Sequence, residues 1–269
     1  MSDGYWKDKV VLVTGGSSGL GRIIAEGFGK LGTKVALVAL EENDLTRVAE
    51  EMRAAGMDVL PLTADITRQE DVDRVFDETV RHYGKLNVLV NNAGRTHRGR
   101  VWETKPEDFR ALFELNVLGT IRCSQKAIPC LLKEKGHIVN IGSLAAKSAS
   151  RWVGAYPVTK FAVAAFSQQL RLELGPEGLH VLLVCPGPIK REAPRLYKLQ
   201  GTEGIPESAL QPGAGVKVGK TDPIWLTDQI IKYCEKRRPE LVVPWKAKIL
   251  FSLTQMWPQL GDWIVLKKT

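Results

Sequence analysis

The sequence predicts one α/β domain built on a doubly wound parallel sheet with helices on both faces. Two observations lead to this fold class. Short apolar runs alternate with amphipathic stretches from the N-terminus onward, and these runs are continuously apolar rather than alternating. Strand–helix alternation at this spacing is typical of parallel strands, and continuous apolarity is typical of strands that are covered on both faces.

The elements follow one another in a regular order. Strands are expected at residues 10–13, 35–40, 58–61, 86–90, 137–141 and 181–185. Helices are expected at residues 20–31, 42–55, 68–83, 106–135 and 155–174. No repeat or low-complexity linker interrupts residues 1–269, so we expect a single domain. The stretch 188–222 is rich in glycine and proline and is expected to form a substrate loop or lid.

The composition excludes several classes of protein. Hydrophobic residues make up 44% and charged residues 25%, which is ordinary for a soluble globular chain. No apolar run is long enough for a membrane-spanning helix, and residues 1–9 lack the apolar core of a secretory signal. The 4 cysteines and 4 histidines show no metal-ligand spacing. We therefore expect a cytoplasmic protein without a disulfide framework or a metal site.

A glycine-rich turn follows the first expected strand and opens the first helix, in the order Thr14-Gly15-Gly16-Ser17-Ser18-Gly19-Leu20-Gly21. Gly15 allows the tight turn, Gly19 lets the backbone approach a pyrophosphate, and Gly21 lets the helix pack close to the strand. A pyrophosphate placed there meets free N–H groups and the positive end of the helix dipole. This context predicts a dinucleotide site.

The spacing T-G-x-x-x-G-x-G resembles that of the short-chain dehydrogenase/reductase family. The likeness continues over residues 7–189 through Asp65, Asn91-Asn92-Ala93-Gly94, Asn116, Ser143, Tyr156 with Lys160, and Pro186-Gly187. These motifs in this order are far more specific than Y-x-x-x-K alone. The resemblance implies a single Rossmann-like dinucleotide-binding domain. It also implies an oxidoreductase that transfers a hydride between a nicotinamide cofactor and a carbonyl or secondary alcohol.

The catalytic residues implied by this resemblance are Asn116, Ser143, Tyr156 and Lys160. Tyr156 and Lys160 are four residues apart and therefore share one face of a helix. A tyrosine has a pKa of about 10, and a nearby cation favours the phenolate that can act as a base. By the same resemblance Lys160 also binds the nicotinamide ribose, Ser143 holds the substrate oxygen, and Asn116 holds a water that links Lys160 to solvent.

The resemblance also implies a cofactor site along the carboxyl ends of the strands. Its expected residues are Gly15, Ser17, Ser18, Gly19, Leu20, Gly21, Leu40, Asp65, Ile66, Asn92, Ala93, Gly94, Tyr156, Lys160, Pro186, Gly187 and Ile189. NAD and NADP remain alternatives. Leu40 stands where users of NADP often have arginine, and Glu41 and Glu42 would repel a phosphate, so the balance favours NAD. NADP stays an alternative because Arg22, on the first helix, is placed to reach a phosphate.

One position departs from the family pattern. The loop after Gly187 usually carries a threonine that contacts the carboxamide, but here it contains Arg191 and no threonine. This departure motivates an alternative function, a nucleotide-binding sensor or scaffold with the same fold and little turnover.

The C-terminal extension, residues 240–269, is apolar and basic. Trp245, Ile249, Leu253, Met256 and Leu260 recur at helical spacing, and Lys267-Lys268 follow. The pattern is typical of a helix at a membrane surface, while packing against a partner subunit is the alternative. Either favours an apolar substrate such as a steroid, a retinoid or a long-chain ketone. Relatives commonly form dimers or tetramers through helices like 106–135 and 155–174, so we expect a homodimer or homotetramer. No nucleic acid partner is expected.

Overall fold

The computed structural model describes residues 4–191, 204–211, 213–214 and 219–268. At its centre lies a seven-stranded sheet with the strand order β3-β2-β1-β4-β5-β6-β7, in which every neighbouring pair is parallel. The strands are β1 (Val10–Thr14), β2 (Lys34–Ala39), β3 (Asp58–Thr63), β4 (Val88–Asn91), β5 (His137–Ile141), β6 (His180–Pro186) and β7 (Glu240–Val243). The strand order reverses between β1 and β4, which places a ligand crevice at their carboxyl ends.

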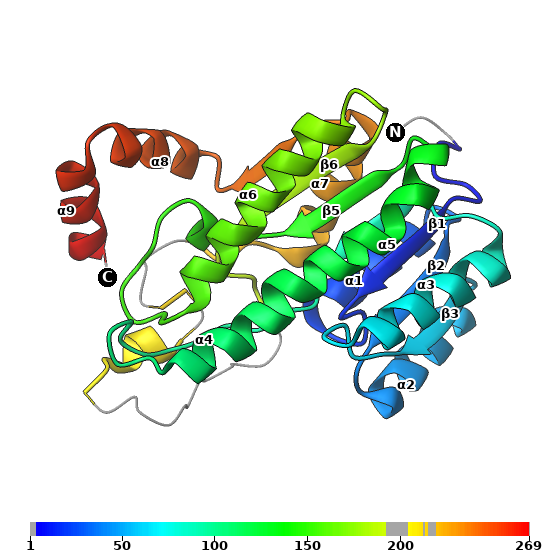
Figure 1. Cartoon of the computed structure of the whole chain (residues 1–269), viewed down its shortest axis with the longest axis horizontal. Coiled ribbons are helices and arrows are strands. Elements are labelled where there is room, and N and C mark those ends of the chain that lie inside the picture. Colours follow the sequence, from blue (N-terminus) through cyan, green and yellow to red (C-terminus); the bar gives the residue numbers. More distant parts are fainter. Residues whose placement is uncertain (1–3, 192–203, 212, 215–218, 269) are drawn as a thin grey trace.

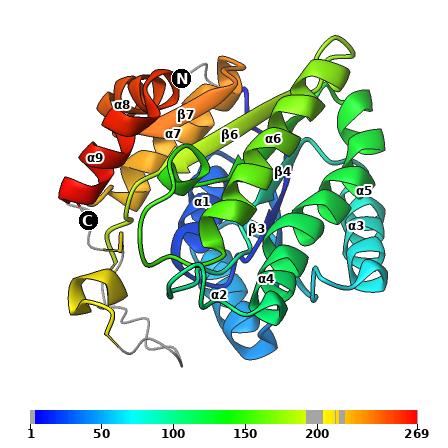
Figure 2. The ribbon, with the colours of Figure 1, turned by 60° about the vertical axis from the view of Figure 1, so that its left-hand side comes forward.

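Helices cover both faces of this sheet (Figures 1 and 2). The helices are α1 (Gly19–Gly29), α2 (Glu42–Ala54), α3 (Gln69–Tyr83), α4 (Pro106–Phe113), α5 (Gly119–Lys133), α6 (Tyr156–Leu174), α7 (Pro223–Glu235), α8 (Lys246–Met256) and α9 (Pro258–Lys268). One core packs α1, α2 and α7 against the sheet, and the other packs α3, α5 and α6 against the opposite face. The predicted fold class is confirmed.

Strand β1 explains why the apolar runs are continuous. Val11 and Val13 belong to the core under α1 and α7, whereas Val10 and Leu12 belong to the core under α3 and α5. Successive side chains of a strand point to opposite faces, so a strand covered on both faces needs an apolar residue at every position. All of β1 is buried.

The structure differs from the sequence expectation in several elements. The helix expected at 106–135 is interrupted by a π-helical turn, Glu114–Leu118. Strand β7 and helix α7 were not among the expected elements. The helical pattern of the C-terminal extension divides into α8 and α9 because Pro258 forces its predecessor Trp257 out of the helical region, to φ −138° and ψ 82°.

The expected loop 188–222 is described only in part. A 3-10 helix spans Glu207–Leu210, and residues 192–203, 212 and 215–218 lie outside the described part of the chain. Among the described residues, no helix combines the length and apolarity that crossing a bilayer requires.

Candidate active site

The glycine turn between β1 and α1 has the backbone that the sequence predicts. Gly15 and Gly19 have φ values of +64° and +53°, in the left-handed region that side chains disfavour. A Cβ on Gly21 would collide with the carbonyl oxygen of Gly15 and with the amide of Asn92. A Cβ on Gly19 would instead meet no heavy atom within 4 Å, so the turn faces open space there. The N-terminus of α1 is therefore accessible to an anionic group.

The segment after β4 holds this turn in place. Asn92 donates through Nδ2 to the carbonyl oxygens of Thr14 (3.0 Å) and Gly15 (3.1 Å). The hydroxyl of Thr14 accepts from the backbone N–H groups of Asn92 and Ala93, both at 3.1 Å. Asn91 is buried and donates to Ser124 and Asn140. These bonds fix β4, β5 and the glycine turn relative to one another.

One part of the expected cofactor site, with Leu40 and Asp65, lies where β2 and β3 end. Leu40, Thr63, Ala64 and Asp65 line a shallow hollow there. Asp65 accepts hydrogen bonds from the backbone N–H (2.9 Å) and hydroxyl (2.7 Å) of Thr67, which orients its carboxylate. The side chain of the expected cofactor residue Ile66 instead packs in the core under α3 and α5. Ile66 therefore offers only its backbone to a ligand in this hollow.

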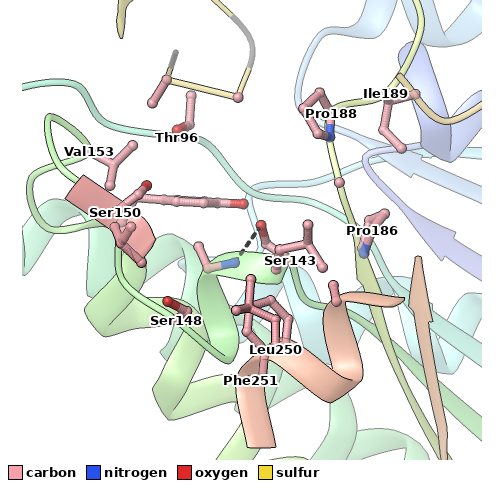
Figure 3. A pocket seen from close by; sticks show the side chains of 18 of the residues that line it. Thr96, Ser143, Ser148, Ser150, Val153, Pro186, Pro188, Ile189, Leu250 and Phe251 are labelled. Atoms are coloured by element: carbon pink, nitrogen blue, oxygen red, sulfur yellow. Dashed lines mark hydrogen bonds between the residues drawn. The ribbon is translucent and has the colours of Figure 1, made fainter. Parts of the chain in front are cut away.

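The groups expected to carry the chemistry come together at the carboxyl ends of β5 and β6. Ser143 follows β5, and Tyr156 lies in the first turn of α6. Both line one cavity of about 260 Å³, together with Pro186 at the end of β6 and Gly187 and Ile189 after it (Figure 3). The serine hydroxyl accepts a hydrogen bond from the N–H of Ala145 at 3.1 Å. Its own hydrogen can still be donated towards a ligand oxygen.

Lys160 lies behind this cavity on the same face of α6 as Tyr156. Its ammonium group is 5.8 Å from the centroid of the Tyr156 ring and donates to the carbonyl oxygen of Ile141 at 2.7 Å. Burial lowers the pKa of Lys160 from 10.5 to about 8. The side chain is therefore still a cation at neutral pH, in a dry environment where its field acts strongly on the neighbouring phenol.

Asn116 lies in the π-helical turn. Its side chain accepts from the N–H of Arg95 (2.9 Å) and donates to the carbonyl oxygen of Arg95 (2.9 Å) and the hydroxyl of Thr159 (3.1 Å). These hydrogen bonds of Asn116 connect α6 to the chain after β4. The π-helical turn that carries Asn116 is a feature found frequently at functional sites. The backbone carbonyl oxygen of Asn116 accepts a hydrogen bond from the hydroxyl of Thr120 at 3.0 Å.

The remaining cavity wall was not predicted from the sequence. Figure 3 shows Leu250 and Phe251 beside Ser143 and Val153 farther away near Ser150, and Ala247, Ile264 and Val265 also contribute. Leu250 and Phe251 belong to α8, and Ile264 and Val265 to α9. The wall is largely apolar. Helical spacing in the sequence indicated these helices, but it gave no sign that they line the same cavity as Ser143.

Arg98 is a further unpredicted residue of this cavity. It is buried, and its guanidinium donates to the carbonyl oxygens of Ala209 (2.9 Å) and Gln211 (3.2 Å). It also donates to the hydroxyl of Thr96 (2.7 Å) and the carbonyl oxygen of His97 (2.8 Å). Arg98 therefore joins the chain after β4 to the described part of the 188–222 loop. Arg191, the departure from the family pattern, also lines the cavity.

Comparison with known proteins agrees with this geometry. The family model described as short chain dehydrogenase matches residues 9–197. The chain is 36% identical to 11-beta-hydroxysteroid dehydrogenase 1A of Arabidopsis thaliana over 267 residues, which cover 95% of this chain and 74% of that protein. It is also 36% identical to 11-beta-hydroxysteroid dehydrogenase-like 2 of the same plant, over 73% of this chain. This chain spans 65% of that relative, slightly less than two thirds.

Among solved structures, one similar fold is described as a short chain dehydrogenase/reductase from Burkholderia phymatum in complex with NAD. The TM-score is 0.84 at 25% sequence identity, and the match covers 97% of this chain and 96% of the other. The likeness therefore extends over nearly the whole chain.

Proposed function

This chain belongs to the short-chain dehydrogenase/reductase family, and we propose that it transfers a hydride between a nicotinamide cofactor and a carbonyl or secondary alcohol. One observation carries the proposal. Ser143 and Tyr156 line the same cavity at the carboxyl ends of β5 and β6, and Lys160 lies behind them as a buried cation. The crevice of a doubly wound sheet is where such a reaction is expected.

The residues present fit a dinucleotide. The open space at Gly19 and the accessible N-terminus of α1 suit a pyrophosphate, because no Cβ or neighbouring atom blocks its approach. Gly187 and Ile189 line the same cavity as Ser143 and Tyr156, and we propose that the nicotinamide would lie against them. When bound, the nicotinamide ring would supply or accept the hydride.

In the proposed reduction, the Tyr156 hydroxyl donates a proton to the carbonyl oxygen, and in oxidation the phenolate accepts the alcohol proton. Ser143 donates a hydrogen bond to the same oxygen. Lys160 stabilises the phenolate, and each unit by which a cation lowers the tyrosine pKa corresponds to about 1.4 kcal/mol. Asn116 supports this arrangement by fixing Thr159, the residue next to Lys160.

We propose an apolar substrate, in the class of steroids, retinoids and long-chain ketones. The support is the apolar wall that α8 and α9 add to the cavity. Such a wall favours a substrate with hydrocarbon surface, while Ser143 and Tyr156 fix the position of its oxygen.

We further propose NAD rather than NADP as the physiological cofactor. Arg22, the basic residue nearest in sequence to the glycine turn, forms ion pairs with Glu26 and Glu51 at 2.7 Å each. Its guanidinium is therefore already engaged by carboxylates. Leu40 is 61% exposed and offers no positive charge to a 2′-phosphate.

The direct test combines binding with turnover. Calorimetric titration with NADH and NADPH should give the lower Kd for NADH, and a panel of ketones and alcohols then identifies a substrate. Tyr156→Phe should keep the cofactor Kd and lose turnover, whereas the matched variant Tyr233→Phe on α7 should keep both. Equal turnover by Tyr156→Phe and the wild type would refute the proposed chemistry.

The alternative of a nucleotide sensor with little turnover rests on Arg191 in the cavity lining. It predicts tight cofactor binding and no turnover of any panel member. Arg191→Thr, which introduces the residue usual in the family, separates the two functions. A large gain in turnover by this variant would favour the sensor, and unchanged turnover would favour the enzyme.

We propose that α8 and α9 also contact an anionic membrane surface, with a partner subunit as the alternative. Ile249, Leu253 and Met256 form an exposed apolar stripe on α8, opposite the residues that line the cavity. Lys246 and Lys248 add positive charge to the same helix, although Lys248 also pairs with Glu240 at 3.5 Å. Apolar and basic side chains together are typical of helices at membrane interfaces.

Vesicle sedimentation distinguishes a membrane surface from a partner subunit as the contact of α8 and α9. The chain should sediment with phosphatidylglycerol vesicles, and Met256→Glu should reduce this binding, while Leu172→Glu, at an exposed apolar position on α6, should not. Dimerisation that Met256→Glu abolishes, without vesicle binding by the wild type, would instead assign the stripe to a partner subunit.

A further inference from the structure

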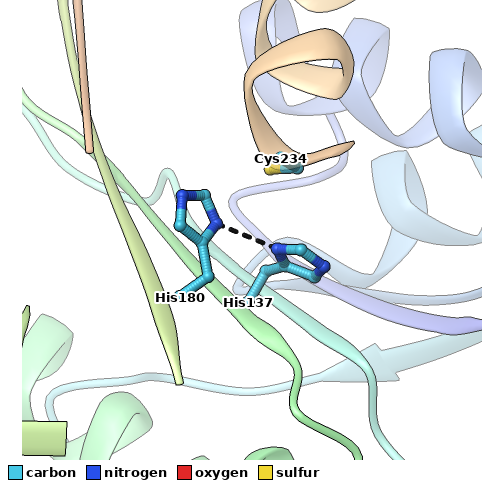
Figure 4. Close-up of side chains that lie close together, drawn as sticks. All are labelled: His137, His180 and Cys234. Atoms are coloured by element: carbon cyan, nitrogen blue, oxygen red, sulfur yellow. Dashed lines mark hydrogen bonds between the residues drawn. The ribbon is translucent and has the colours of Figure 1, made fainter. Parts of the chain in front are cut away.

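A cluster of metal-ligand side chains lies at the opposite end of the sheet from the proposed active site. His137 begins β5, His180 begins β6, and Cys234 lies near the end of α7 (Figure 4). One ligand atom from each residue lies within 4.8 Å of the other two, and all three side chains are buried. The spacing along the sequence does not indicate this group, because its members come from three separate elements that the fold brings together.

The outer nitrogens of the two imidazoles are held by other groups. His180 Nε2 lies 2.9 Å from the carbonyl oxygen of Arg238, and His137 Nε2 lies 3.2 Å from the hydroxyl of Tyr5. The inner nitrogens, Nδ1 of each ring, face one another at 2.9 Å. Metal-binding histidines usually have their second nitrogen fixed in this way by a carbonyl or another polar group, while the first faces the ion.

Without an ion, the two histidines form a continuous series of hydrogen bonds between the Arg238 carbonyl and the Tyr5 hydroxyl. The Arg238 carbonyl can only accept, so His180 donates from Nε2 and its Nδ1 accepts from His137. Nε2 of His137 then accepts from the hydroxyl of Tyr5. Both rings are neutral in this arrangement, in agreement with the burial that lowers the pKa of His137 to about 2 and that of His180 to about 4.

We propose that His137, His180 and Cys234 form a second site, which binds a soft metal ion through both Nδ1 atoms and the cysteine sulfur. Ligand atoms on one ion lie roughly 3.3–3.8 Å apart, given metal–ligand bonds of about 2.0 Å to nitrogen and 2.3 Å to sulfur. The separations in the cluster bracket this range, from 2.9 Å between the Nδ1 atoms to at most 4.8 Å. Small side-chain rotations therefore suffice to coordinate an ion.

Charge selects monovalent copper over zinc. One thiolate and two neutral imidazoles give a neutral complex with Cu(I) but leave a net charge of about +1 with Zn(II). Arg237 and Lys9 place positive charge near His137, and Glu235 places negative charge near Cys234, so the charge of the three ligands themselves decides between the ions. Burial of all three ligands also disfavours the water that a three-ligand zinc site usually holds.

Binding has a definite proton balance. The Cys234 thiol loses its proton when sulfur bonds to the ion. The proton on Nδ1 of His137 moves to Nε2 of the same ring, which then donates to the Tyr5 oxygen instead of accepting from it. One proton is therefore released for each Cu(I) bound, and no electron is transferred, because the ion enters already reduced.

The test is an anaerobic Cu(I) titration of the chelator-treated full chain in competition with bicinchoninate, with release of protons followed by an indicator dye. The wild type should bind one equivalent and release one proton. Cys234→Ser and His180→Asn should each lower the affinity at least 100-fold. Cys123→Ser, which alters a buried thiol on α5 outside the cluster, should bind as the wild type does.

Thermal unfolding of each variant, without copper, checks that it is folded. Equal Cu(I) affinity in the wild type and Cys234→Ser would overturn the proposal, as would an equal loss in Cys123→Ser. A parallel titration with Zn(II) tests the charge argument, and tighter binding of Zn(II) than of Cu(I) would overturn the assignment to copper. The proposed site does not depend on the hydride-transfer function, because all its readouts are independent of turnover.

Discussion

Strands β5 and β6 have very different surroundings at their two ends. At the carboxyl ends, Ser143 and Tyr156 face a cavity, and the buried cation Lys160 lies behind them. At the amino ends, His137 and His180 are buried against α7 and bonded to each other. The same sheet therefore exposes polar groups to a cavity at one end and buries them among neighbouring elements at the other. This contrast indicates that substitutions at the carboxyl ends affect activity, whereas those at the amino ends affect stability.

Lys160→Met should break the carboxyl-end arrangement most severely. We expect kcat/KM to fall by roughly 10²–10⁴-fold, the usual contribution of assisted proton transfer. The free energy of unfolding at pH 7 should meanwhile rise by about 1–3 kcal/mol, because a buried ammonium is removed at the cost of one hydrogen bond to Ile141. Steady-state kinetics and urea unfolding measure the two effects. A variant that is both inactive and less stable would contradict this account.

The same lysine predicts a pH dependence of stability. Its pKa is about 8 in the folded chain and 10.5 in the unfolded chain, so the unfolded state binds more protons between these values. The free energy of unfolding of the wild type should therefore include a Lys160 contribution that increases from pH 8 to about 10.5. Lys160→Met should lack this contribution, and parallel pH profiles of the two proteins would contradict the shifted pKa.

Gly21→Ala should have the next largest effect, on the cofactor. The added Cβ would collide with the Gly15 carbonyl oxygen and displace α1 from the turn. We expect the Kd for NADH to rise by about 10²-fold and stability to fall by about 2–3 kcal/mol. Gly219→Ala is the matched control, because a Cβ there meets no heavy atom within 4 Å. Similar calorimetric affinities for the two variants would argue against the proposed role of Gly21.

Arg98→Lys should have a smaller and more selective effect. A lysine lacks the planar fork that reaches Ala209 and Gln211 together with Thr96, so the cavity wall should loosen. We expect KM for the substrate to rise about 10-fold, with kcat and the Kd for NADH nearly unchanged. Arg110→Lys, at an exposed ion pair on α4, should leave all three constants as they are. A fall in kcat alone would assign Arg98 a different role.

Asn87→Ala tests the amino ends and should leave activity almost unaffected. Asn87 is buried, accepts from the N–H of Val10 at 2.9 Å and donates to Glu134 at 2.9 Å. Removing it leaves the buried N–H without this acceptor and should cost about 1–3 kcal/mol of stability. Denaturant unfolding should show the loss while kcat/KM stays within about two-fold. A larger kinetic effect would show that the two ends of the sheet are coupled.

The sequence predicted most of the fold because each element leaves a local pattern. The apolar runs at 10–13 and 137–141 coincide with β1 and β5 to within one residue. Strand β7 was missed, since Glu240–Val243 is short and follows a basic segment. The π-helical turn at Asn116 was missed for a different reason. It interrupts the hydrogen-bond pattern of a helix without interrupting its apolar periodicity.

Sequence alone determined the parallel sheet, the glycine turn and the pairing of Tyr156 with Lys160, because each depends on backbone conformation or on side chains within a few residues. Only the tertiary structure decided that α8 and α9 wall the cavity, that Arg98 joins two loops, and that His137, His180 and Cys234 converge. These contacts depend on how elements that are distant in the sequence pack together. Packing imposes no fixed sequence spacing on the residues in contact, so no local pattern indicates them.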